Sequence, residues 1–449
     1  MALPSIFSRE SRKPTDAIRW FAGVSITATC QRIESAMVGI HGQGSGAPVE
    51  IRKTISFDIP REIIDSFNEL QETLHSQEEQ RAANAQRTAD VIERQDDITI
   101  PIGLAHHVAR ELACIEEEAI HELIGESRLT ANDVLAVGVN DPGLRVATAH
   151  GTFYQGLCDA PHLAEQTGLN IVDALPAQDI AARGNGGPIF PLSAWVFLKS
   201  EKSDRILIDL GRTARLTYFP KPENAFTHQK IRQIDVVPCG SLLDTLVWQL
   251  TNGKTSVDTG GRVAVQGCQS PQLMSALRGA MPLSSSWAPT GLKPDRYLKA
   301  INNEPRMSKS GLSHQDILCT VSGFIAETVA EKVQNLLKTS HRGEPELVIQ
   351  GSGWQHGLLM NALSTQLHKR TLLPISQFGI PVDTFDALCT AMLTSLTVDH
   401  VPGNLPHLTG SETAKTLGRI TPGSIANWHR LLCEMAGTKP ANRSLRSAM

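Results

Sequence analysis

Apolar positions along this chain follow two different periods. Residues 18–24 form a short apolar run, and residues 36–40 and 53–59 alternate apolar with polar side chains, so we expect three strands at the start of the chain. The pattern then changes. Residues 61–95 are rich in Glu, Gln, Arg and Ala, with apolar side chains at helical spacing, which predicts one or two amphipathic helices. For residues 77–95, a mobile polar insertion is the alternative.

Strand and helix patterns continue to alternate along the rest of the chain. Further strands are expected at residues 134–139, 171–172, 205–210, 214–219 and 346–350. Helices are expected at residues 106–124, 242–250, 315–337, 358–367 and 384–396. Residues 179–191 are rich in Gly and Pro and are expected to form an irregular loop. Strand, hairpin and helix units in both halves predict an α/β protein with two related lobes.

The length of the chain also favours two lobes. Its 449 residues exceed the roughly 250–300 residues that one hydrophobic core usually serves. We expect an N-terminal lobe over residues 18–234, with the helical segment inserted in it, and a C-terminal lobe over residues 235–437. A polar leader at residues 1–17 and a disordered tail at residues 438–449 complete the predicted organisation.

Composition excludes several classes of function. The chain is 41% hydrophobic and 20% charged with a net charge of −4, so it lacks the basic excess expected of a nucleic-acid-binding protein. No run of 18 apolar residues predicts a membrane span, and the N-terminus lacks the apolar core of a secretion signal. Eight scattered cysteines without a CxxC pair argue against a zinc site and suit reduced thiols, which predicts a cytoplasmic protein.

Two motifs near the end of the chain are its most distinctive feature. Residues 401–410 read VPGNLPHLTG, and residues 378–387 read FGIPVDTFDA. Together they resemble the closing signature of the anhydro-N-acetylmuramic acid kinases. The resemblance extends from about residue 19 to residue 422 and is stronger in the second half of the chain. It implies the fold of the actin/hexokinase superfamily, in which two actin-like (ribonuclease H-like) lobes surround a central cleft.

The same resemblance implies an activity. Family members use ATP and Mg²⁺ to open the 1,6-anhydro ring of an amino sugar with water and to phosphorylate O6 in cell-wall sugar recycling. It also implies that the protein is a homodimer and that it binds a small amino sugar.

The turn after the first strand resembles a phosphate-binding loop of that family. The family's Gly-Thr-Ser-Leu-Asp-Gly turn corresponds to residues 23–32, GVSITATCQR, which implies that Gly23, Thr27 and Thr29 lie near phosphate. Gln31 stands where the family has a metal-placing aspartate, and a neutral amide is a weaker ligand for a hard cation. An ordinary turn between two strands is the alternative interpretation.

Sugar contacts are implied by a second motif. Residues 178–188, QDIAARGNGGP, are similar to the family's Arg-Asp-Ile-Ala-Ala-Gly-Gly-Gln-Gly-Ala-Pro, which implies that Asp179, Asn185 and Gly186 bind substrate. Asp386 stands in place of a family glutamate on the last predicted helix and is assigned the same role. For Asp179, a structural capping role is an equally good alternative to substrate binding.

Two segments depart from the family's sugar site. Its Asp-Phe-Arg has become Ala174-Leu175-Pro176, which removes a charged pair unless Asp173 compensates from one position earlier. Its His-Gly-Gln-Thr motif has no counterpart after the 134–139 strand. His150 begins a run that is similar to this motif, which suggests a sugar contact, and an ordinary loop histidine is the alternative interpretation.

The loop that would carry the general base retains its carboxylate. Residues 235–240, DVVPCG, resemble the family's Asp-Thr-Gly-Pro-Gly-Asn, which implies that Asp235 activates the attacking water. Asp244 also keeps its place. However, Val237 replaces a glycine, and a β-branched residue strongly disfavours positive φ.

Two further turns are assigned to the nucleotide. Residues 209–215, DLGRTAR, correspond to the family's Asn-Ile-Gly-Gly-Ile-Ala-Asn, which implies that Gly211 lies near phosphate. Arg212 replaces a glycine there. Its guanidinium suits phosphate, but pairing of Asp209 with Arg212 or Arg215 is the simpler alternative. The turn at residues 351–353, with Gly351, Ser352 and Gly353, corresponds to the family's adenosine loop.

Two hypotheses follow from these sequence features. The first is a divergent sugar kinase in which Asp235 is the base. The second is a catalytically inactive descendant that acts as a sugar-binding or dimeric scaffold protein, since several phosphate-loop glycines and a metal-placing acid are absent.

Overall fold

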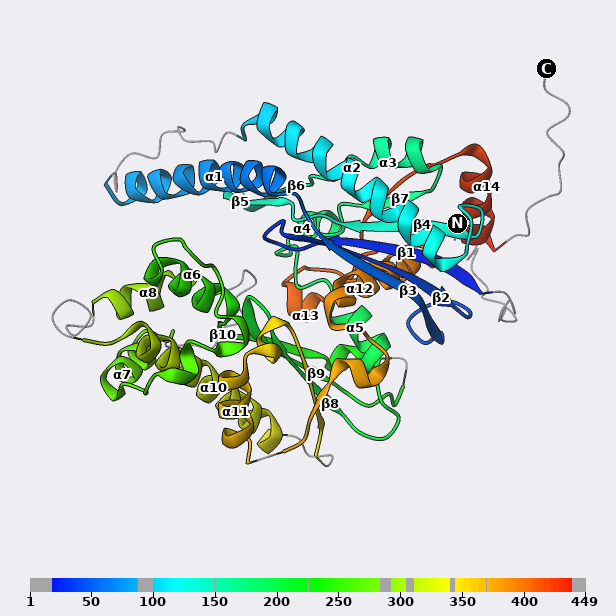
Figure 1. Ribbon diagram of the computed structural model, residues 1–449. Coiled ribbons are helices and arrows are strands. Elements are labelled where there is room, and N and C mark those ends of the chain that lie inside the picture. The colour runs from blue at the N-terminus through cyan, green and yellow to red at the C-terminus, as the bar shows by residue number, and fades with distance from the viewer. Residues whose placement is uncertain are drawn as a thin grey trace, which may run out of the picture. The chain divides into compact units, whose positions relative to one another are not determined.

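The chain forms two compact units in a computed structural model (Figure 1). The structure describes residues 18–87, 100–148, 151–224, 226–282, 292–303, 311–339, 344–368 and 370–437. Unit 1 comprises Met1–Ala177, Asp386–Gly403 and Thr416–Met449, and unit 2 comprises Gln178–Phe385 and Asn404–Lys415. The predicted leader and tail, the end of the predicted helical insertion, and His150 lie outside the described residues.

Unit 1 is built on a six-stranded sheet. Its strands are β1 (Arg19–Ile26), β2 (Arg32–Ile40), β3 (Val49–Asp58), β4 (Val134–Asn140), β7 (Ile171–Asp173) and β13 (Arg419–Thr421), in the order β13-β7-β4-β1-β2-β3. β1, β4 and β7 are mutually parallel, whereas β2 is antiparallel to β1 and β3. β1, β2 and β4 are buried along nearly their whole length, as their apolar runs predict for central strands.

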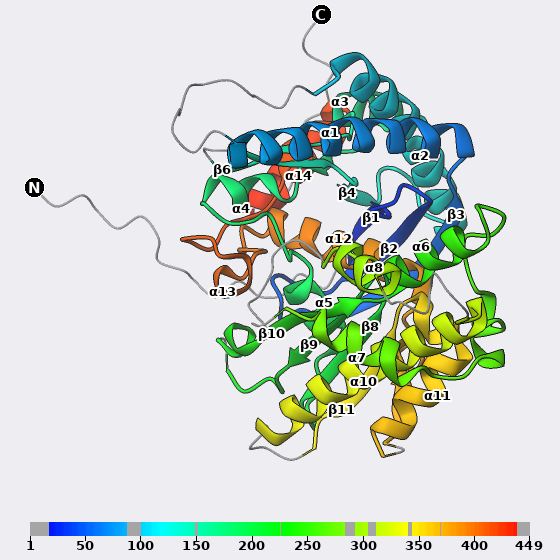
Figure 2. The ribbon, with the colours of Figure 1, turned by 90° about the vertical axis from the view of Figure 1, so that its left-hand side faces the viewer.

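Helices cover both faces of this sheet (Figures 1 and 2). The helices of unit 1 are α1 (Arg61–Arg87), α2 (Ile102–Ser127), α3 (Ala160–Thr167), α12 (Phe385–Val398) and α14 (Ile425–Ala436), and β5 (Leu144–Thr148) and β6 (Gly151–Gln155) form a separate hairpin. Ala22 and Val24 of β1 pack in a core with α1, α2 and α3. Gly23, between them, faces the opposite side and meets α12.

Unit 2 repeats the same strand order. Its strands are β8 (Arg205–Leu210), β9 (Thr213–Phe219), β10 (Arg232–Pro238), β11 (Glu346–Gln350) and β12 (Leu372–Pro374), in the order β10-β9-β8-β11-β12. β9 is antiparallel to β8 and β10, and β11 is parallel to β8 and β12. This matches β3-β2-β1-β4-β7 of unit 1 strand for strand, so the predicted α/β fold with two related, actin-like lobes is confirmed.

Helices and short turns complete unit 2. Its α-helices are α5 (Pro191–Leu198), α6 (Gly240–Leu250), α7 (Pro271–Gly279), α8 (Asp295–Asn302), α10 (His314–Thr339), α11 (Gly357–Gln366) and α13 (Pro406–Thr409), while α4 (Ala177–Ala181) begins at the boundary with unit 1. Its 3₁₀ turns are η1 (Thr227–Lys230), η2 (Thr259–Gly261), η3 (Ala264–Gln266), η4 (Ser352–Gln355), η5 (Ile375–Phe378) and η6 (Val382–Thr384). Apolar residues of β8 and β11 form one core with α6, α7, α8, α10 and α11.

The division between the units differs from the predicted boundary at residues 234 and 235. The chain enters unit 2 at Gln178 because β8 and β9 hydrogen-bond into the same sheet as β10 and β11. It returns to unit 1 at Asp386 because α12 packs against β1, and again at Thr416 because β13 pairs with β7. These pairings join residues far apart in sequence, so local patterns do not reveal them.

Two local predictions also need correction. The segment 179–191 was expected to be irregular throughout, but α4 includes Asp179 and α5 begins at Pro191. The helix predicted over residues 384–396 is not the last long one, because α14 adds a further 12 residues of helix. The predicted helix from residue 61 is confirmed as far as Arg87.

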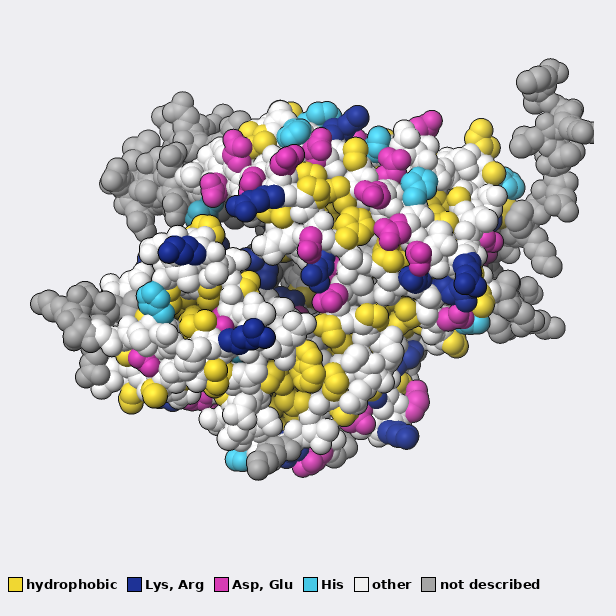
Figure 3. All heavy atoms as spheres, viewed as in Figure 1, with side chains coloured by type: hydrophobic (Ala, Val, Ile, Leu, Met, Phe, Trp, Pro, Cys, Tyr) yellow, Lys and Arg dark blue, Asp and Glu magenta, His cyan; other side chains and the backbone are white. Residues whose placement is uncertain are grey.

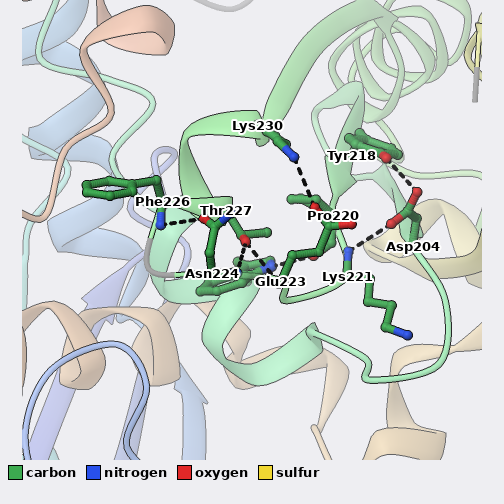
Figure 4. A network of polar contacts seen from close by, with 10 residues as sticks. Asp204, Tyr218, Pro220, Lys221, Glu223, Asn224, Phe226, Thr227 and Lys230 are labelled. Atoms are coloured by element: carbon green, nitrogen blue, oxygen red, sulfur yellow. Dashed lines mark hydrogen bonds and ion pairs between the residues drawn. The ribbon is translucent and has the colours of Figure 1, made fainter. Parts of the chain in front are cut away.

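Polar contacts hold together the edge of the unit 2 sheet where β8 begins (Figure 4). The Asp204 carboxylate accepts hydrogen bonds from the Tyr218 hydroxyl at 2.6 Å and from the Lys221 N–H at 2.8 Å. In the loop that follows, Thr227 Oγ1 accepts from the Asn224 N–H at 2.9 Å. These bonds fix the connection from β9 to β10 and leave the opposite ends of the strands for other contacts.

The surface carries both signs of charge. On the face shown in Figure 3, Lys and Arg side chains are interspersed with Asp and Glu, in keeping with the small net charge of −4. Within the described ranges, no helix combines the length and apolar character needed to cross a bilayer.

The close approach of β1 and α12 makes a prediction about Gly23. A Cβ added there would lie 2.1 Å from the Ala387 carbonyl oxygen and 2.4 Å from the Ala391 nitrogen, so strand and helix would have to separate. We expect Gly23→Ala to lower the free energy of unfolding by about 1–3 kcal/mol, measured by urea denaturation. Gly125→Ala in α2, where the added methyl meets open space, is the matched control and is expected to be neutral or stabilising. Equal stability of the two variants would contradict this account of the packing.

Candidate functional site

Three turns meet at one edge of the unit 2 sheet. β8, β10 and β11 run parallel and end at Leu210, Pro238 and Gln350 respectively. The turns that follow therefore leave the sheet at the same edge. In open α/β sheets, ligands bind outside the carboxyl ends of the strands.

Glycines allow two of these turns to touch. Gly351 has a φ of 88°, and a Cβ there would lie 2.5 Å from the Gly211 nitrogen. A Cβ on Gly353 would lie 2.7 Å from the Leu210 carbonyl oxygen. Any side chain at either position would push the turns apart. The structure thus brings together Gly211 and the 351–353 turn, which the sequence assigned to phosphate and adenosine.

A row of four polar residues crosses the sheet beside these turns. Asp235 of β10 is paired in register with Arg215 of β9, Arg215 with Asp209 of β8, and Asp209 with Gln350 of β11. Arg215 Nε donates to Asp235 Oδ1 at 2.6 Å, and the Asp235 side chain is 8% exposed. Asp235 therefore lies at one end of this row, and Gln350, at its other end, directly precedes the Gly351 turn.

The Asp209 carboxylate organises the turn that follows it. Its Oδ1 accepts from the Gly211 N–H at 3.0 Å. Burial raises the pKa of Asp209, and the Arg215 guanidinium and hydrogen bonds from Gly211 and Gln350 oppose that rise. The sequence left open whether Asp209 pairs with Arg212 or Arg215. In the structure, Arg215 forms its close ion pair with Asp235. The sequence did not predict this pair because it depends on the register of neighbouring strands.

The turn after Asp235 is closed by backbone hydrogen bonds. Cys239 N–H and Ser241 N–H donate to the Arg212 carbonyl at 2.8 and 3.1 Å, and Gly240 N–H donates to the Gly211 carbonyl at 3.0 Å. The first N–H groups of a helix often bind phosphate, but here they are bonded to the β8–β9 turn. These donors do not fit a phosphate group without rearrangement.

Two buried valines explain the shape of that turn. β10 continues through Val236 and Val237 to Pro238, and both valine side chains are buried in the unit 2 core. β-branched side chains favour the extended conformation. The residues that replace the family's glycine turn therefore form the end of a strand.

The predicted sugar-site residues Asp179, Asn185 and Gly186 form one network with the C-terminal motif. Asn404 Nδ2 donates to Asp179 Oδ1 at 2.6 Å, and Gly186 N–H donates to Asp179 Oδ2 at 2.9 Å. The Asn185 N–H and side-chain amide both donate to the Thr409 carbonyl at 2.9 Å. Asp179 is fully buried, so its carboxylate holds the glycine loop to the 404–409 segment. Asn404 belongs to the VPGNLPHLTG motif, and its role as a partner of Asp179 depends on a contact between segments far apart in the chain.

Gly23, Thr27 and Thr29 lie in unit 1, where the turn between β1 and β2 is bonded to itself. Thr27 Oγ1 accepts from the Gln31 and Arg32 N–H groups at 3.2 and 3.1 Å. Thr29 is half-buried in the same turn. The hydroxyl of Thr27 thus has a structural role, which matches the alternative of an ordinary turn, and a phosphate role for these residues stays a prediction.

Asp386 and Asp173 are also in unit 1. Asp386 is exposed in the first turn of α12 and precedes Ala387, whose carbonyl lies against Gly23. Asp173 is buried and bound by Arg419 of β13, with 3.1 Å between Nε and Oδ1. A charged pair therefore exists beside the altered 174–176 segment, and its arginine was not foreseen because it comes from a distant strand.

A buried acidic group lies in the interior of unit 1. Glu116 of α2 is fully buried, and neither of its carboxyl oxygens has a hydrogen-bond partner among the described residues. Burial raises the pKa of Glu116 well above its usual range, and the nearby Asp141 and Asp173 raise it further. Asp141 is satisfied by the Tyr154 hydroxyl at 2.7 Å and by the Leu157 N–H.

Two bulky residues follow the 351–353 turn. His356 Nδ1 accepts from the Leu359 N–H at 3.3 Å and caps α11, and burial lowers the pKa of its imidazole. His356 is therefore structural. Trp354 stays 37% exposed beside the turn. Over the ranges that the structure describes, no group of three or more His, Cys, Asp or Glu side chains is arranged to hold a metal ion.

Comparison with known proteins connects these motifs to one family. The family model described as "Anhydro-N-acetylmuramic acid kinase" matches residues 66–423. The anhydro-N-acetylmuramic acid kinase of Ralstonia nicotianae is 27% identical over 318 residues, covering 70% of this chain and 81% of the relative. That of a Synechococcus strain is 30% identical over 275 residues, covering 61% and 72%.

One solved structure overlaps most of the chain more weakly. The activator of the 2-hydroxyisocaproyl-CoA dehydratase from Clostridium difficile, with bound ADPNP, matches with a TM-score of 0.38 and 10% identity over 84% of this chain and 94% of its own. A TM-score this low supports no argument about either protein.

Proposed function

The chain belongs to the anhydro-N-acetylmuramic acid kinase family, and we propose that it uses ATP to open the 1,6-anhydro ring of an amino sugar and to phosphorylate O6. The observation that carries the proposal is Asp235, a retained carboxylate that Arg215 holds in the row of polar residues across the unit 2 sheet. Asp209 and Gln350 of the same row precede the two touching glycine turns. A positioned carboxylate is what general-base activation of water requires.

In this proposal the Asp235 carboxylate accepts a proton from water while the water oxygen bonds to the anomeric carbon. The bond from that carbon to O6 breaks, and O6 takes the γ-phosphoryl group of ATP with release of ADP. Arg215 orients the base through its ion pair of 2.6 Å. Mg²⁺ would neutralise phosphate charge during transfer, and we assign it no ligand in this chain.

The remaining predicted residues take supporting roles. Gly351, Ser352 and Gly353 would receive adenosine, and Gly211 would lie close to the phosphates without donating its N–H, which is bonded to Asp209. Gly23, Thr27 and Thr29 would contact phosphate. Asn185, Gly186 and Asp386 would contact the sugar, with buried Asp179 holding the glycine loop in place.

A second candidate function is a catalytically inactive family member that binds sugar or acts as a dimeric scaffold. The observation that favours it is the closed turn at residues 239–241, whose N–H groups are bonded to the carbonyls of Gly211 and Arg212. In this case the sugar would bind without turnover. Under either function, a homodimer remains a prediction from the resemblance, and a cytoplasmic location remains a prediction from the scattered cysteines.

An assay with the full chain separates the two. Purified protein is incubated with ATP, Mg²⁺ and 1,6-anhydro-N-acetylmuramic acid, and the mixture is followed by ³¹P NMR and mass spectrometry. We expect a sugar phosphate monoester and ADP in equal amounts, and none when the anhydro sugar is replaced by N-acetylglucosamine. Sugar binding by calorimetry without any phosphate product would rule out the kinase and support the scaffold.

A further inference from the structure

We propose that the guanidinium of Arg212 is the main polyphosphate-binding group of unit 2, in place of the backbone N–H groups of the 239–241 turn. The ligand class is a nucleoside triphosphate, and the proposal rests on the proposed function. Arg212 stands at the turn between β8 and β9, next to Gly211.

The backbone around Arg212 leaves little else to bind phosphate on this turn. Its own carbonyl accepts three hydrogen bonds, from the N–H groups of Cys239 and Ser241 at 2.8 and 3.1 Å and from Ser241 Oγ at 2.8 Å. The Gly211 N–H is bonded to Asp209, and the Gly240 N–H to the Gly211 carbonyl. The donors usually offered to phosphate at such a turn are therefore occupied, and these bonds fix the backbone from which the Arg212 side chain extends.

The guanidinium itself is accessible and lacks a close counter-ion. Arg212 is an exposed residue, and it makes no ion pair with any residue that the structure describes. Burial nevertheless lowers the pKa of its guanidinium, so the group lies against the protein surface rather than extended in bulk water. The Asp244 carboxylate in α6 opposes this shift electrostatically.

Asp244 is a weak partner for this cation. Burial raises the pKa of Asp244 to about 6, and Arg212 lowers it only in part. Both groups have lost hydration without forming a close ion pair. A phosphate group would supply the missing charge and two oxygens in the geometry that a guanidinium binds bidentately. The nearby N-terminus of α6 favours the same negative charge.

This arrangement makes Asp244 a competitor of phosphate for Arg212. Neutralising Asp244 would therefore strengthen phosphate binding, whereas removing the guanidinium would weaken it. If Arg212 and Asp244 only stabilised the fold as a pair, both substitutions would act in the same direction. The opposite signs distinguish a ligand-binding group from a structural one.

The test measures binding of ATP, ADP and adenosine to the full chain by calorimetry at pH 7.5, with folding followed by thermal unfolding. We expect Arg212→Ala to raise the Kd of ATP on the order of 10- to 100-fold and to leave the Kd of adenosine unchanged. The Kd of ATP for Arg212→Lys should lie between the values for the unsubstituted protein and for Arg212→Ala, since lysine keeps the charge but lacks the planar guanidinium fork. Asp244→Asn should lower the Kd of ATP.

Arg232→Ala is the matched control, because Arg232 lies at the opposite end of β10 and is exposed. We expect it to bind ATP like the unsubstituted protein. An unchanged Kd of ATP in folded Arg212→Ala would overturn the proposal, as would an unsubstituted protein that binds no ATP. ATP binding that depends on Arg212 without sugar phosphorylation would instead reject the proposed function and retain this inference.

Discussion

Asp235→Asn is expected to lower kcat for sugar phosphorylation by about 10²- to 10⁴-fold, the range that a positioned general base contributes. The amide keeps the shape of the side chain but cannot accept the proton of the attacking water. The KM for ATP should change little, since the glycine turns at Gly211 and Gly351 do not depend on this charge. Steady-state kinetics with coupled detection of ADP, together with quantified sugar phosphate, measures both parameters.

Asp58→Asn is the matched control for that substitution. Asp58 also faces an arginine across two neighbouring strands, with 3.3 Å to Arg32 Nε, but its side chain is 82% exposed in unit 1. An exposed ion pair of this kind contributes little to stability. The kcat and the free energy of unfolding of Asp58→Asn should therefore equal those of the unsubstituted protein. If Asp235→Asn kept kcat within about threefold of the unsubstituted enzyme, another residue would have to act as the base.

Glu116→Gln is expected to remove a pH dependence from the stability of the chain. The folded state raises the pKa of Glu116 above its ordinary value of 4.5 and therefore binds its proton more tightly than the unfolded state does. The contribution of Glu116 to stability is then fully present below pH 4.5 and is lost as pH rises from there toward the folded pKa. The substitution leaves a group that does not titrate, so this part of the decline disappears.

Glu116→Leu tests the magnitude of the same effect. A buried carboxyl group without hydrogen-bond partners among the described residues costs about 1–3 kcal/mol of stability, and an apolar side chain of similar volume removes this cost. The gain in stability should be larger at pH 8 than at pH 5. Urea denaturation at both pH values measures the free energy of unfolding. Glu118→Gln, an exposed position on the same helix, should change neither value. A loss of stability in both Glu116 variants at pH 8 would mean that the carboxylate has a favourable partner.

Local patterns in the sequence predicted most individual elements well. The strand expected at residues 346–350 coincides with β11, and the hairpin expected at residues 205–219 is β8 and β9. Both follow from apolar runs bounded by Gly or charged residues, and such signals depend only on neighbours in the chain. Two related lobes were also predicted, although the units share no recognisable sequence repeat, and the repeated strand order came only from the structure.

The boundary between the units was not predictable in this way. β13 pairs with β7 although the two strands are far apart in the sequence, and Asn404 donates a hydrogen bond to Asp179, which lies 225 positions earlier. Two segments that resemble the family, residues 178–188 and 401–410, are thus joined by this buried amide–carboxylate bond, and no local pattern indicates the contact. Side-chain pairing over such distances is decided when the sheets form.

The sequence by itself determined the α/β class, the family and the positions of the glycine turns, because these depend on residue type and spacing. Only the tertiary structure decided that Arg215 binds Asp235 and that the N–H groups of the 239–241 turn are already bonded to the 211–212 carbonyls. The reason is strand register, which sets the residues that face one another on neighbouring strands and is not encoded by any single segment.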